Sequence, residues 1–357
     1  MQTKIVYVLT CAEDTTYIEQ ALISIWSARY HNPDAQILLL VDDKTDDLLI
    51  GTRGELLNYI SKKIVVPFED TTLTPMYRSR WIKTQVRQMI EGDFLFIDSD
   101  TICQRPLTDL DNFNCEIGAV LESHLQVSEF CTSLYESTQK LCATIGVDID
   151  VEQFYFSSGV LYVKDTKQTH RLYELWHQYW MEGNAKGLGI DQPSLAKANR
   201  EIGHIIEQIQ DSYNCILFTR PPFIRKAHIL HIAAYQNPSF LFTHNVLTYI
   251  KKNGVENKYL QLLILSPCST IMPFDYNLKY SSIRERFMWI GELSHAWKWY
   301  KTHIDVACEI FPNNTHLHKV IKLLIQYDYL KLAIWLYLLE TRCHLYRKKI
   351  KHNVCQK

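Results

Sequence analysis

Two carboxylates one residue apart, Asp98 and Asp100, follow the apolar run at 94–97. If that run forms a buried strand, side chains two positions apart leave the same face and lie close enough to share one ligand. Two such acids repel each other and lose hydration unless a cation or a set of donors lies between them. A hard divalent cation, Mg²⁺ or Mn²⁺, suits the pair best, because it takes its remaining oxygens from water and phosphates. The motif alone also fits a strand end with two solvated acids, so both interpretations stay open.

Cationic side chains precede the acidic pair. The segment 76–91 has helical periodicity and ends at a glycine, and its basic or hydroxyl residues Arg80, Lys83, Thr84 and Arg87 recur at the spacing of one helix face. The chain has no glycine-rich dinucleotide or Walker sequence, so a diphosphate would be neutralised by this face and a metal. A solvated cationic face is the alternative, and Arg87 could instead pair with Glu91.

Two further stretches place polar groups beside glycine. Ser157 and Ser158 form a small-residue kink before a predicted strand, and Gly159 indicates a close backbone approach, although an ordinary strand turn fits too. Asp191 and Gln192 stand in a glycine-flanked loop at a helix start, where Asp191 could be a plain N-cap.

Histidines 228 and 231 lie on a strand-like run at 227–235. Because they are three positions apart they point to opposite faces, so only one of them can ligate a metal. Imidazole is an acceptable third ligand for Mn²⁺, but a core or surface histidine is the commoner case.

The elements that must position these groups alternate along the first hundred residues. Strands are predicted at 4–11, 36–41, 64–68 and 93–97, with helices at 15–30, roughly 46–60 and 76–91 between them. This order predicts an α/β fold with a mostly parallel sheet covered by helices on both faces. The carboxyl ends of such strands gather ligands. The edge would therefore carry Thr10, Cys11, Asp42, Asp43, Asp98 and Asp100.

Length and composition bound the function classes. At 357 residues with 47% hydrophobic residues, the chain can form a full catalytic domain plus an appendage, or two modest domains. A net charge of −1 argues against a general polyanion binder. Ten scattered cysteines without a Cys-x-x-Cys pair indicate reduced thiols. Neither a signal peptide nor a run of 18 uncharged apolar residues is found, so a cytoplasmic protein is expected.

In order, these stretches resemble the GT-A fold glycosyltransferases, and most nearly the group that includes glycogenin and the lipopolysaccharide galactosyltransferases. The resemblance spans roughly residues 4–240. It is carried by Ser79–Lys83, the Phe96–Asp100 motif, Tyr155–Leu161, Ile190–Gln192 and Ile229–His231.

The resemblance implies a site and a reaction. Asp98, Asp100 and His231 would hold Mn²⁺ or Mg²⁺ against the diphosphate of a nucleotide sugar, and Asp191 with Gln192 would be the catalytic residues beside the transferred sugar. The remaining donor-binding residues would be Thr10, Cys11, Arg80, Lys83, Ser99, Ser157 and Ser158. The reaction would be transfer of a hexose, from UDP-Gal or UDP-Glc, to a glycan or lipid-linked saccharide with retention, as in lipopolysaccharide or capsule synthesis.

The sequence departs from the family pattern at two places. Ser157 stands where the family usually has Asn, and Asn237 stands where a lysine shortly after the metal histidine supports the diphosphate. Neutralisation would then depend more on the metal, Arg80 and Lys83, or activity would be reduced.

The expected domains are a catalytic domain over 1–240 and a helical C-terminal region over 241–357. The first would divide into a nucleotide-sugar-binding half at about 1–103 and an acceptor-side half at about 104–240. Beyond Glu340 the tail is basic and follows an aromatic and apolar run, which fits attachment to an anionic membrane surface or a helix packed on the catalytic domain. Nucleic-acid binding is disfavoured because the rest of the chain is not basic.

Two other functions remain as alternatives. A haloacid-dehalogenase-like phosphatase also has an Asp-x-Asp strand. In that family the motif follows the first strand and a glycine follows the second Asp, whereas in this chain the motif ends the fourth predicted strand and Thr101 follows Asp100. A non-catalytic protein that binds glycans or nucleotide sugars on a degenerate transferase fold is suggested by the missing lysine.

Overall fold

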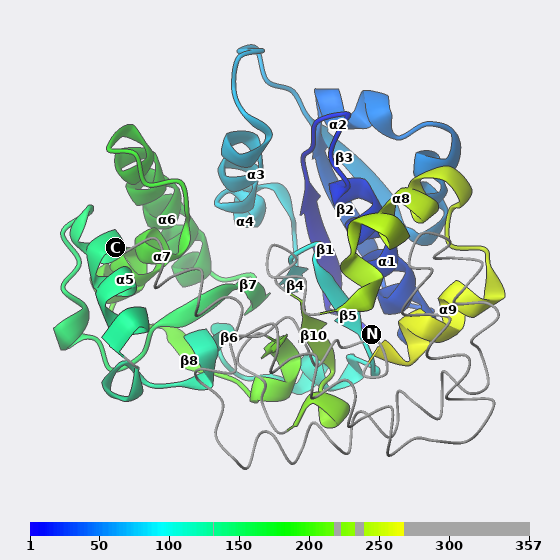
Figure 1. The fold of residues 1–357 in the computed structure, drawn as a ribbon. Coiled ribbons are helices and arrows are strands. Elements are labelled where there is room, and N and C mark those ends of the chain that lie inside the picture. The colour runs from blue at the N-terminus through cyan, green and yellow to red at the C-terminus, as the bar shows by residue number, and fades with distance from the viewer. Residues whose placement is uncertain (131, 218–222, 233–238, 268–357) are drawn as a thin grey trace, which may run out of the picture.

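A seven-stranded mixed sheet forms the centre of the chain in the computed structural model, which describes residues 1–130, 132–217, 223–232 and 239–267 (Figure 1). The strand order is β3-β2-β1-β4-β7-β6-β8. The strands are β1 (Lys4–Leu9), β2 (Ile37–Asp42), β3 (Lys62–Val66), β4 (Phe94–Ile97), β6 (Ile117–Leu121), β7 (Phe156–Val163) and β8 (Ile206–Gln208).

The sheet is mostly parallel, as predicted. Strands β3, β2, β1 and β4 pair in parallel, and β6 pairs in parallel with β8. Only β7 runs against its neighbours β4 and β6. This reversal brings the amino end of β7 to the edge where the other strands have their carboxyl ends.

Both faces of the sheet are buried. Along β1, Ile5, Tyr7 and Leu9 belong to one apolar cluster, while Val6 and Val8 belong to another on the opposite face. The period-two alternation of a strand sends successive side chains to these two cores, which explains why strand sequences are apolar at nearly every position.

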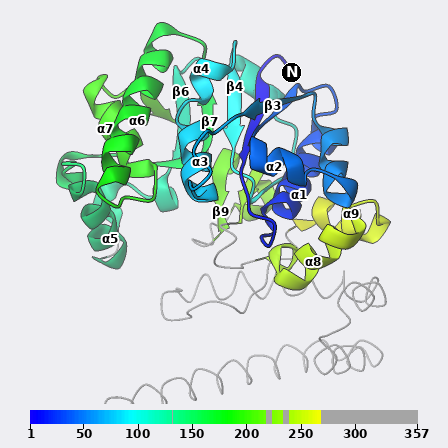
Figure 2. The same cartoon turned by 90° about the horizontal axis from the view of Figure 1, so that it is seen from above.

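The helices lie in two groups on either side of β4, the strand that precedes Asp98. They are α1 (Tyr17–His31), α2 (Asp43–Leu48), α3 (Pro75–Lys83), α4 (Val86–Met89), α5 (Thr132–Ala143), α6 (Lys167–Ala185), α7 (Gln192–Glu201), α8 (His244–Asn253) and α9 (Lys258–Leu265). Figures 1 and 2 both show α5, α6 and α7 on one side, α1, α2, α8 and α9 on the other, and α3 with α4 between the groups.

Two predicted helices are each divided in the structure. The helix expected at 46–60 is α2 followed by a 3₁₀ helix, η1 (Gly51–Tyr59), because Gly51 adopts a φ of +55° between them. The helix expected at 76–91 is broken at Thr84 and Gln85 into α3 and α4. The Thr84 hydroxyl contacts the ring of His177 on α6 at 2.8 Å, which holds the break against that helix.

Other boundaries shift by a few residues. The third strand begins at Lys62 rather than at 64, because Lys62 pairs with Leu38 of β2. Ser157 and Ser158, predicted at a kink before a strand, lie inside β7.

A second, small sheet lies beside the acidic motif. It has the order β5-β10-β9, formed by β5 (Thr101–Cys103), β10 (Ile229–His231) and β9 (Cys215–Ile216). β5 and β10 are antiparallel and pair Thr101 with His231. The segment at 229–231 therefore returns to the end of the acidic motif from 130 residues farther along the chain.

Residues 241–267 continue the core of the first half. Val246 and Ile250 of α8, and Leu260 and Leu263 of α9, are buried in the same apolar cluster as Ile5 of β1. The Glu55 carboxylate of η1 accepts a hydrogen bond from the backbone of Val255 at 3.0 Å, just beyond α8. The rest of the predicted appendage, with its basic tail, lies outside the described residues.

Within the described ranges, no helix combines the length and apolarity needed to cross a bilayer.

Candidate functional site

The predicted metal ligands come together at the carboxyl end of β4. One ligand atom from each of Asp98, Asp100 and His231 can be chosen so that all three lie within 4.8 Å of one another. Asp98 follows β4 directly, Asp100 precedes β5, and His231 ends β10, which pairs with β5. His231 Nε2 lies 3.3 Å from Asp100 Oδ1. The pairing of β10 with β5 thus places an imidazole against two carboxylates.

Gly159 is needed for this approach. It lies opposite Asp98, whose backbone N–H donates to the Gly159 carbonyl at 2.8 Å. A Cβ at this position would lie 2.3 Å from Cε1 of His231 and 3.0 Å from Oδ2 of Asp98. The close backbone approach predicted for this glycine is therefore present, and its neighbour is the histidine.

The far side of the His231 ring contacts a buried amide. His231 Nδ1 lies 2.9 Å from Oδ1 of Asn214, whose Nδ2 donates to the Ser157 hydroxyl at 3.2 Å. Asn214 is fully buried at the end of a 3₁₀ helix (Asp211–Asn214) before β9. Sequence reasoning missed Asn214, because nothing in its local sequence distinguishes it from a turn residue.

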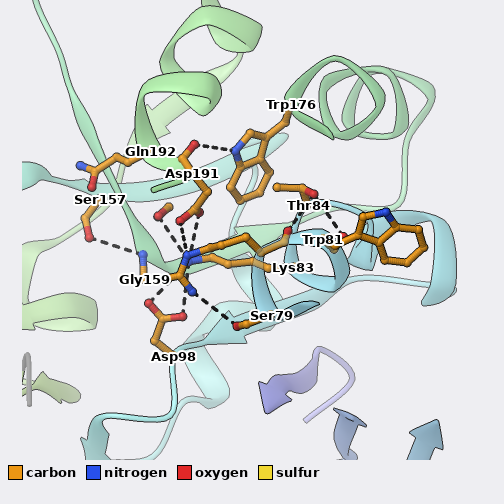
Figure 3. Close-up of polar contacts among 12 residues, drawn as sticks. Ser79, Trp81, Lys83, Thr84, Asp98, Ser157, Gly159, Trp176, Asp191 and Gln192 are labelled. Carbon is orange, nitrogen blue, oxygen red and sulfur yellow. Dashed lines mark hydrogen bonds and ion pairs between the residues drawn. The ribbon is translucent and has the colours of Figure 1, made fainter. Parts of the chain in front are cut away.

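A buried lysine links the acidic pair to Asp191. Lys83 Nζ lies 3.3 Å from Asp98 Oδ1, 3.3 Å from Asp191 Oδ2 and 3.3 Å from Ser158 Oγ (Figure 3). It also lies 4.9 Å from the centre of the Phe96 ring. Because the ammonium has three protons and three protein acceptors around it, Lys83 is enclosed by the protein.

Arg80 occupies the outer side of this network. Its Nε lies 3.0 Å from Asp191 Oδ1, and its side chain keeps 29% of its surface exposed. Arg80 and Lys83 are three residues apart on α3, so they reach the same carboxylate from one helix face, as the spacing predicted. Arg80 is the cation of the pair that a bound ligand can reach.

The charges around Asp191 and Asp98 act in opposite directions. Burial alone would raise the pKa of Asp191, but the cations of Lys83 and Arg80 hold it below its ordinary value, so this carboxyl stays ionised. For Asp98, burial and the neighbouring Asp100 raise the pKa in spite of Lys83. A cation bound between Asp98 and Asp100 would favour the ionised form of both carboxyls.

The loop that carries Asp191 and Gln192 is fixed from two sides. The Trp176 indole of α6 donates to the Asp191 carbonyl at 2.9 Å (Figure 3), and the Gln192 amide donates to the Glu122 carboxylate at 2.8 Å. Asp191 precedes α7 at the N-cap position, but its side chain makes no capping hydrogen bond and turns to the cations instead. Glu122, at the end of β6, was not among the predicted site residues.

Other predicted residues lie at the same edge with different partners. Thr10 donates its hydroxyl to the Pro75 carbonyl at the start of α3, and the Cys11 backbone donates to the Thr45 hydroxyl. Ser99 lies half-buried between the two aspartates. Asp42, expected at the ligand edge, is instead buried in an ion pair with Arg78 and caps α2.

Two predictions at this edge are resolved by the packing. Arg87 does not join the Arg80 face, because the break after α3 turns it to Asp165, 3.2 Å away, rather than to Glu91. Its guanidinium also lies 4.8 Å from the Phe94 ring centre. Of the two histidines, His228 contacts the Ser212 hydroxyl and His231 lies beside the acidic pair. Only one of the two rings therefore reaches the acidic pair, as their spacing of three residues predicted.

No family model and no curated protein matches the sequence of this chain. Three similar solved structures are all glycosyltransferases by name. A galactosyltransferase, LgtC, in complex with donor and acceptor sugar analogues, is 15% identical, with 76% of this chain and 98% of that chain covered and a TM-score of 0.47. Apo mouse xyloside xylosyltransferase 1 is 14% identical, with coverages of 65% and 98% and a TM-score of 0.43. The apo bifunctional glycosyltransferase WbbM is also 14% identical, with coverages of 65% and 45% and a TM-score of 0.43. Likeness of this degree assigns no activity to this chain.

Proposed function

We propose that this chain is a metal-dependent glycosyltransferase that moves a hexose from a nucleotide sugar to a saccharide. The observation that carries the proposal is the joining of two groups of side chains. Asp98, Asp100 and His231 lie close enough together to hold a divalent cation, and Lys83 bridges this group to Asp191. A cation site and a carboxylate that share one ammonium as neighbour suit the diphosphate and the sugar of a nucleotide sugar.

The donor set fits Mn²⁺ or Mg²⁺. Two carboxylates and one imidazole are hard or borderline ligands, and three protein ligands leave room for phosphate oxygens. When bound, such an ion supplies positive charge against the diphosphate leaving group. The pKa of Asp98, which burial and Asp100 raise, supports the proposal, because a bound cation would favour the ionised carboxylate.

The protein side chains would divide the remaining work. Arg80, half-exposed beside Asp191, would contact the donor phosphates. Lys83 has its protons directed at protein acceptors, so under this proposal it positions Asp98 and Asp191 rather than binding the diphosphate directly. Asp191 would accept a hydrogen bond from a sugar hydroxyl, while Arg80 and Lys83 hold its carboxylate in place.

Gln192 would lie beside the transferred sugar with Glu122 fixing its amide. A carboxylate only accepts, so the amide NH₂ must face Glu122 and the carbonyl oxygen must face away from it. Thr10 and Cys11 would belong to the donor side through the edge they share with α3, and Ser99, Ser157 and Ser158 through the acidic motif and β7.

The finer identity of the reaction follows the resemblance. We propose UDP-Gal or UDP-Glc as donor, a glycan or lipid-linked saccharide as acceptor, and retention of the anomeric configuration. An inverting reaction would instead need a carboxylate as general base beside the acceptor, whereas the Glu122 carboxylate accepts from the Gln192 amide. Proton NMR of the first-formed product distinguishes the two stereochemical outcomes.

The two alternatives remain distinguishable. A phosphatase of the haloacid-dehalogenase type would need a nucleophilic Asp after the first strand, whereas Asp98 follows the fourth and its neighbours are Lys83 and His231. A non-catalytic protein would bind donor without turnover. The lysine position that prompted this alternative, Asn237, lies outside the described residues.

Calorimetry with UDP and Mn²⁺ tests the proposal. We expect UDP to bind only with Mn²⁺, and Asp100→Ala to abolish this binding without unfolding the protein. Asp109→Ala is the control, because Asp109 is exposed and outside the site. Absence of metal-dependent UDP binding in the wild type would refute the transferase, and binding without hydrolysis or transfer across a screen of UDP and GDP sugars would favour the non-catalytic protein.

A cytoplasmic location with peripheral membrane attachment is part of the same proposal. The membrane attachment would depend on the basic tail after Glu340, which lies outside the described residues. Cosedimentation with anionic vesicles tests this attachment.

A further inference from the structure

We propose that Asn214 is a positioning residue that fixes the orientation and the tautomer of His231, with Ser157 holding the amide in place. This inference rests on the proposed metal site. It concerns how the chain prepares its nitrogen ligand, and it involves two residues whose contacts only the folded structure shows.

The contacts form a continuous line from β7 to the metal ligands. Gly159 N–H donates to the Ser157 hydroxyl at 3.4 Å, Asn214 Nδ2 donates to the same oxygen at 3.2 Å, and Asn214 Oδ1 lies 2.9 Å from His231 Nδ1. The opposite ring nitrogen, Nε2, lies 3.3 Å from Asp100 Oδ1. The imidazole is therefore held at one nitrogen and presented to the acidic pair at the other.

The chemistry of imidazole makes this arrangement favour one tautomer of the ring. A neutral ring has one proton, and a nitrogen that ligates a metal must carry the lone pair. If Nε2 faces the metal, the proton must sit on Nδ1 and needs an acceptor there. Asn214 Oδ1 is that acceptor, because the other end of its amide is engaged by Ser157.

Burial makes the amide effective. Asn214 is fully buried and Ser157 is 5% exposed, so water does not readily replace either group. Gly159 lies against the ring near Cε1 and Nδ1, which limits movement of the imidazole toward β7. Hydrogen-bonding partners behind a ligating histidine commonly change metal affinity by about 10- to 100-fold.

The affinity of the full-length protein for Mn²⁺ alone, measured by electron paramagnetic resonance, tests the role of Asn214. Asn214→Leu, which removes the acceptor and keeps the branching of the side chain, should weaken Mn²⁺ binding by about 10- to 100-fold. Asn214→Asp keeps an acceptor facing the ring and should stay within about threefold of the wild type. Asn199→Leu is the matched control, since Asn199 is also buried but accepts from the Ile206 backbone, away from the metal ligands.

The outcomes separate this inference from the proposed function. If the wild type binds no Mn²⁺, the metal site and the inference both fail. If the wild type binds Mn²⁺, Asp100→Ala abolishes binding and Asn214→Leu binds as well as the wild type, only the inference is overturned.

A second measurement avoids any variant at Asn214 that fails to fold. In the wild-type protein labelled with [¹⁵N]histidine and loaded with diamagnetic Mg²⁺, His231 is identified by comparison with His231→Ala. Its ring should carry the proton on Nδ1 and none on Nε2. A proton on Nε2 in the loaded protein would overturn the proposal.

Discussion

At the scale of single residues, the site depends on ionised groups that are buried and mutually paired. Lys83 has two carboxylate partners at 3.3 Å, and neither Lys83 nor Asp191 is exposed to solvent by more than a few per cent of its side-chain surface. A buried charge that loses its partner is strongly unfavourable, because desolvation is no longer offset. The same residues therefore matter for stability and for the proposed reaction.

Replacing Lys83 by Met should lower the free energy of unfolding by about 3–5 kcal/mol, because Asp98 and Asp191 then lose a buried cation. Added Mn²⁺ should restore part of this loss if it binds Asp98. Denaturant unfolding with and without Mn²⁺ measures both effects. Lys197→Met is the control, since Lys197 is half-buried on α7 in an ion pair 3.8 Å long, and should cost less than about 1 kcal/mol.

Gly159→Ala should displace His231 and weaken Mn²⁺ binding at least tenfold, because the added Cβ would lie 2.3 Å from the ring. Titration with Mn²⁺ monitored by electron paramagnetic resonance gives the affinity. The control is Gly189→Ala, whose Cβ would meet only the flexible end of Met76 at 3.3 Å. Equal Mn²⁺ affinities for the two variants would show that His231 is not a ligand.

At the scale of elements, the break between α3 and α4 decides which cations reach the site. An unbroken helix would keep Arg87 on the face of Arg80, whereas the break sends Arg87 to Asp165. The break is packed against α6 through the Thr84–His177 contact and through Trp81, whose ring centre lies 5.6 Å from that of His177. This interface contains His177, whose pKa is lowered.

Burial lowers the pKa of His177 below its ordinary value of 6.5. Above that value the ring is neutral in the folded and unfolded states, so stability is unaffected. As the pH falls below 6.5, the unfolded chain takes up the proton first, and stability is lost until the lower folded pKa is passed.

His177→Gln should therefore reduce the loss of stability between pH 7 and pH 5 relative to the wild type. Unfolding by urea at several pH values measures this difference, and the other histidines contribute equally to both proteins. Parallel pH profiles for the two proteins would contradict the assignment.

At the scale of the whole molecule, the described part of the chain after residue 240 is joined to the first half. α8 and α9 bury apolar side chains in the cluster that contains β1 and α1. Lys251 of α8 also donates to the Glu13 carbonyl at 2.9 Å, in the loop after β1. We therefore expect these helices to unfold together with the sheet.

Ile250→Ala should lower the free energy of unfolding by about 2–5 kcal/mol, because Ile250 is buried in this shared cluster. Leu262→Ala, at a position 43% exposed on α9, should have a much smaller effect. Calorimetry should show one main transition that shifts as a unit. A separate early transition affected only by Ile250→Ala would indicate that residues 241–357 form an independent domain.

The sequence by itself determined the parts of the protein that depend on local pattern. Alternating apolar segments predicted the parallel strands, and helical spacing placed Arg80 and Lys83 on one face. The spacing of Asp98 and Asp100 predicted that they share a ligand, although both lie in the bend between β4 and β5 rather than in a strand. The glycine at 159 indicated a close approach without revealing its partner. These features follow from backbone geometry within a few residues.

Only the tertiary structure decided which distant groups meet. The reversal of β7 brings Ser158 and Gly159 to Asp98, and the antiparallel pairing of β10 with β5 brings His231 to Asp100. Asn214 and Glu122 join the site through contacts across 17 and 70 residues of chain. Strand direction and packing between elements set these contacts, and no local pattern of side chains encodes them.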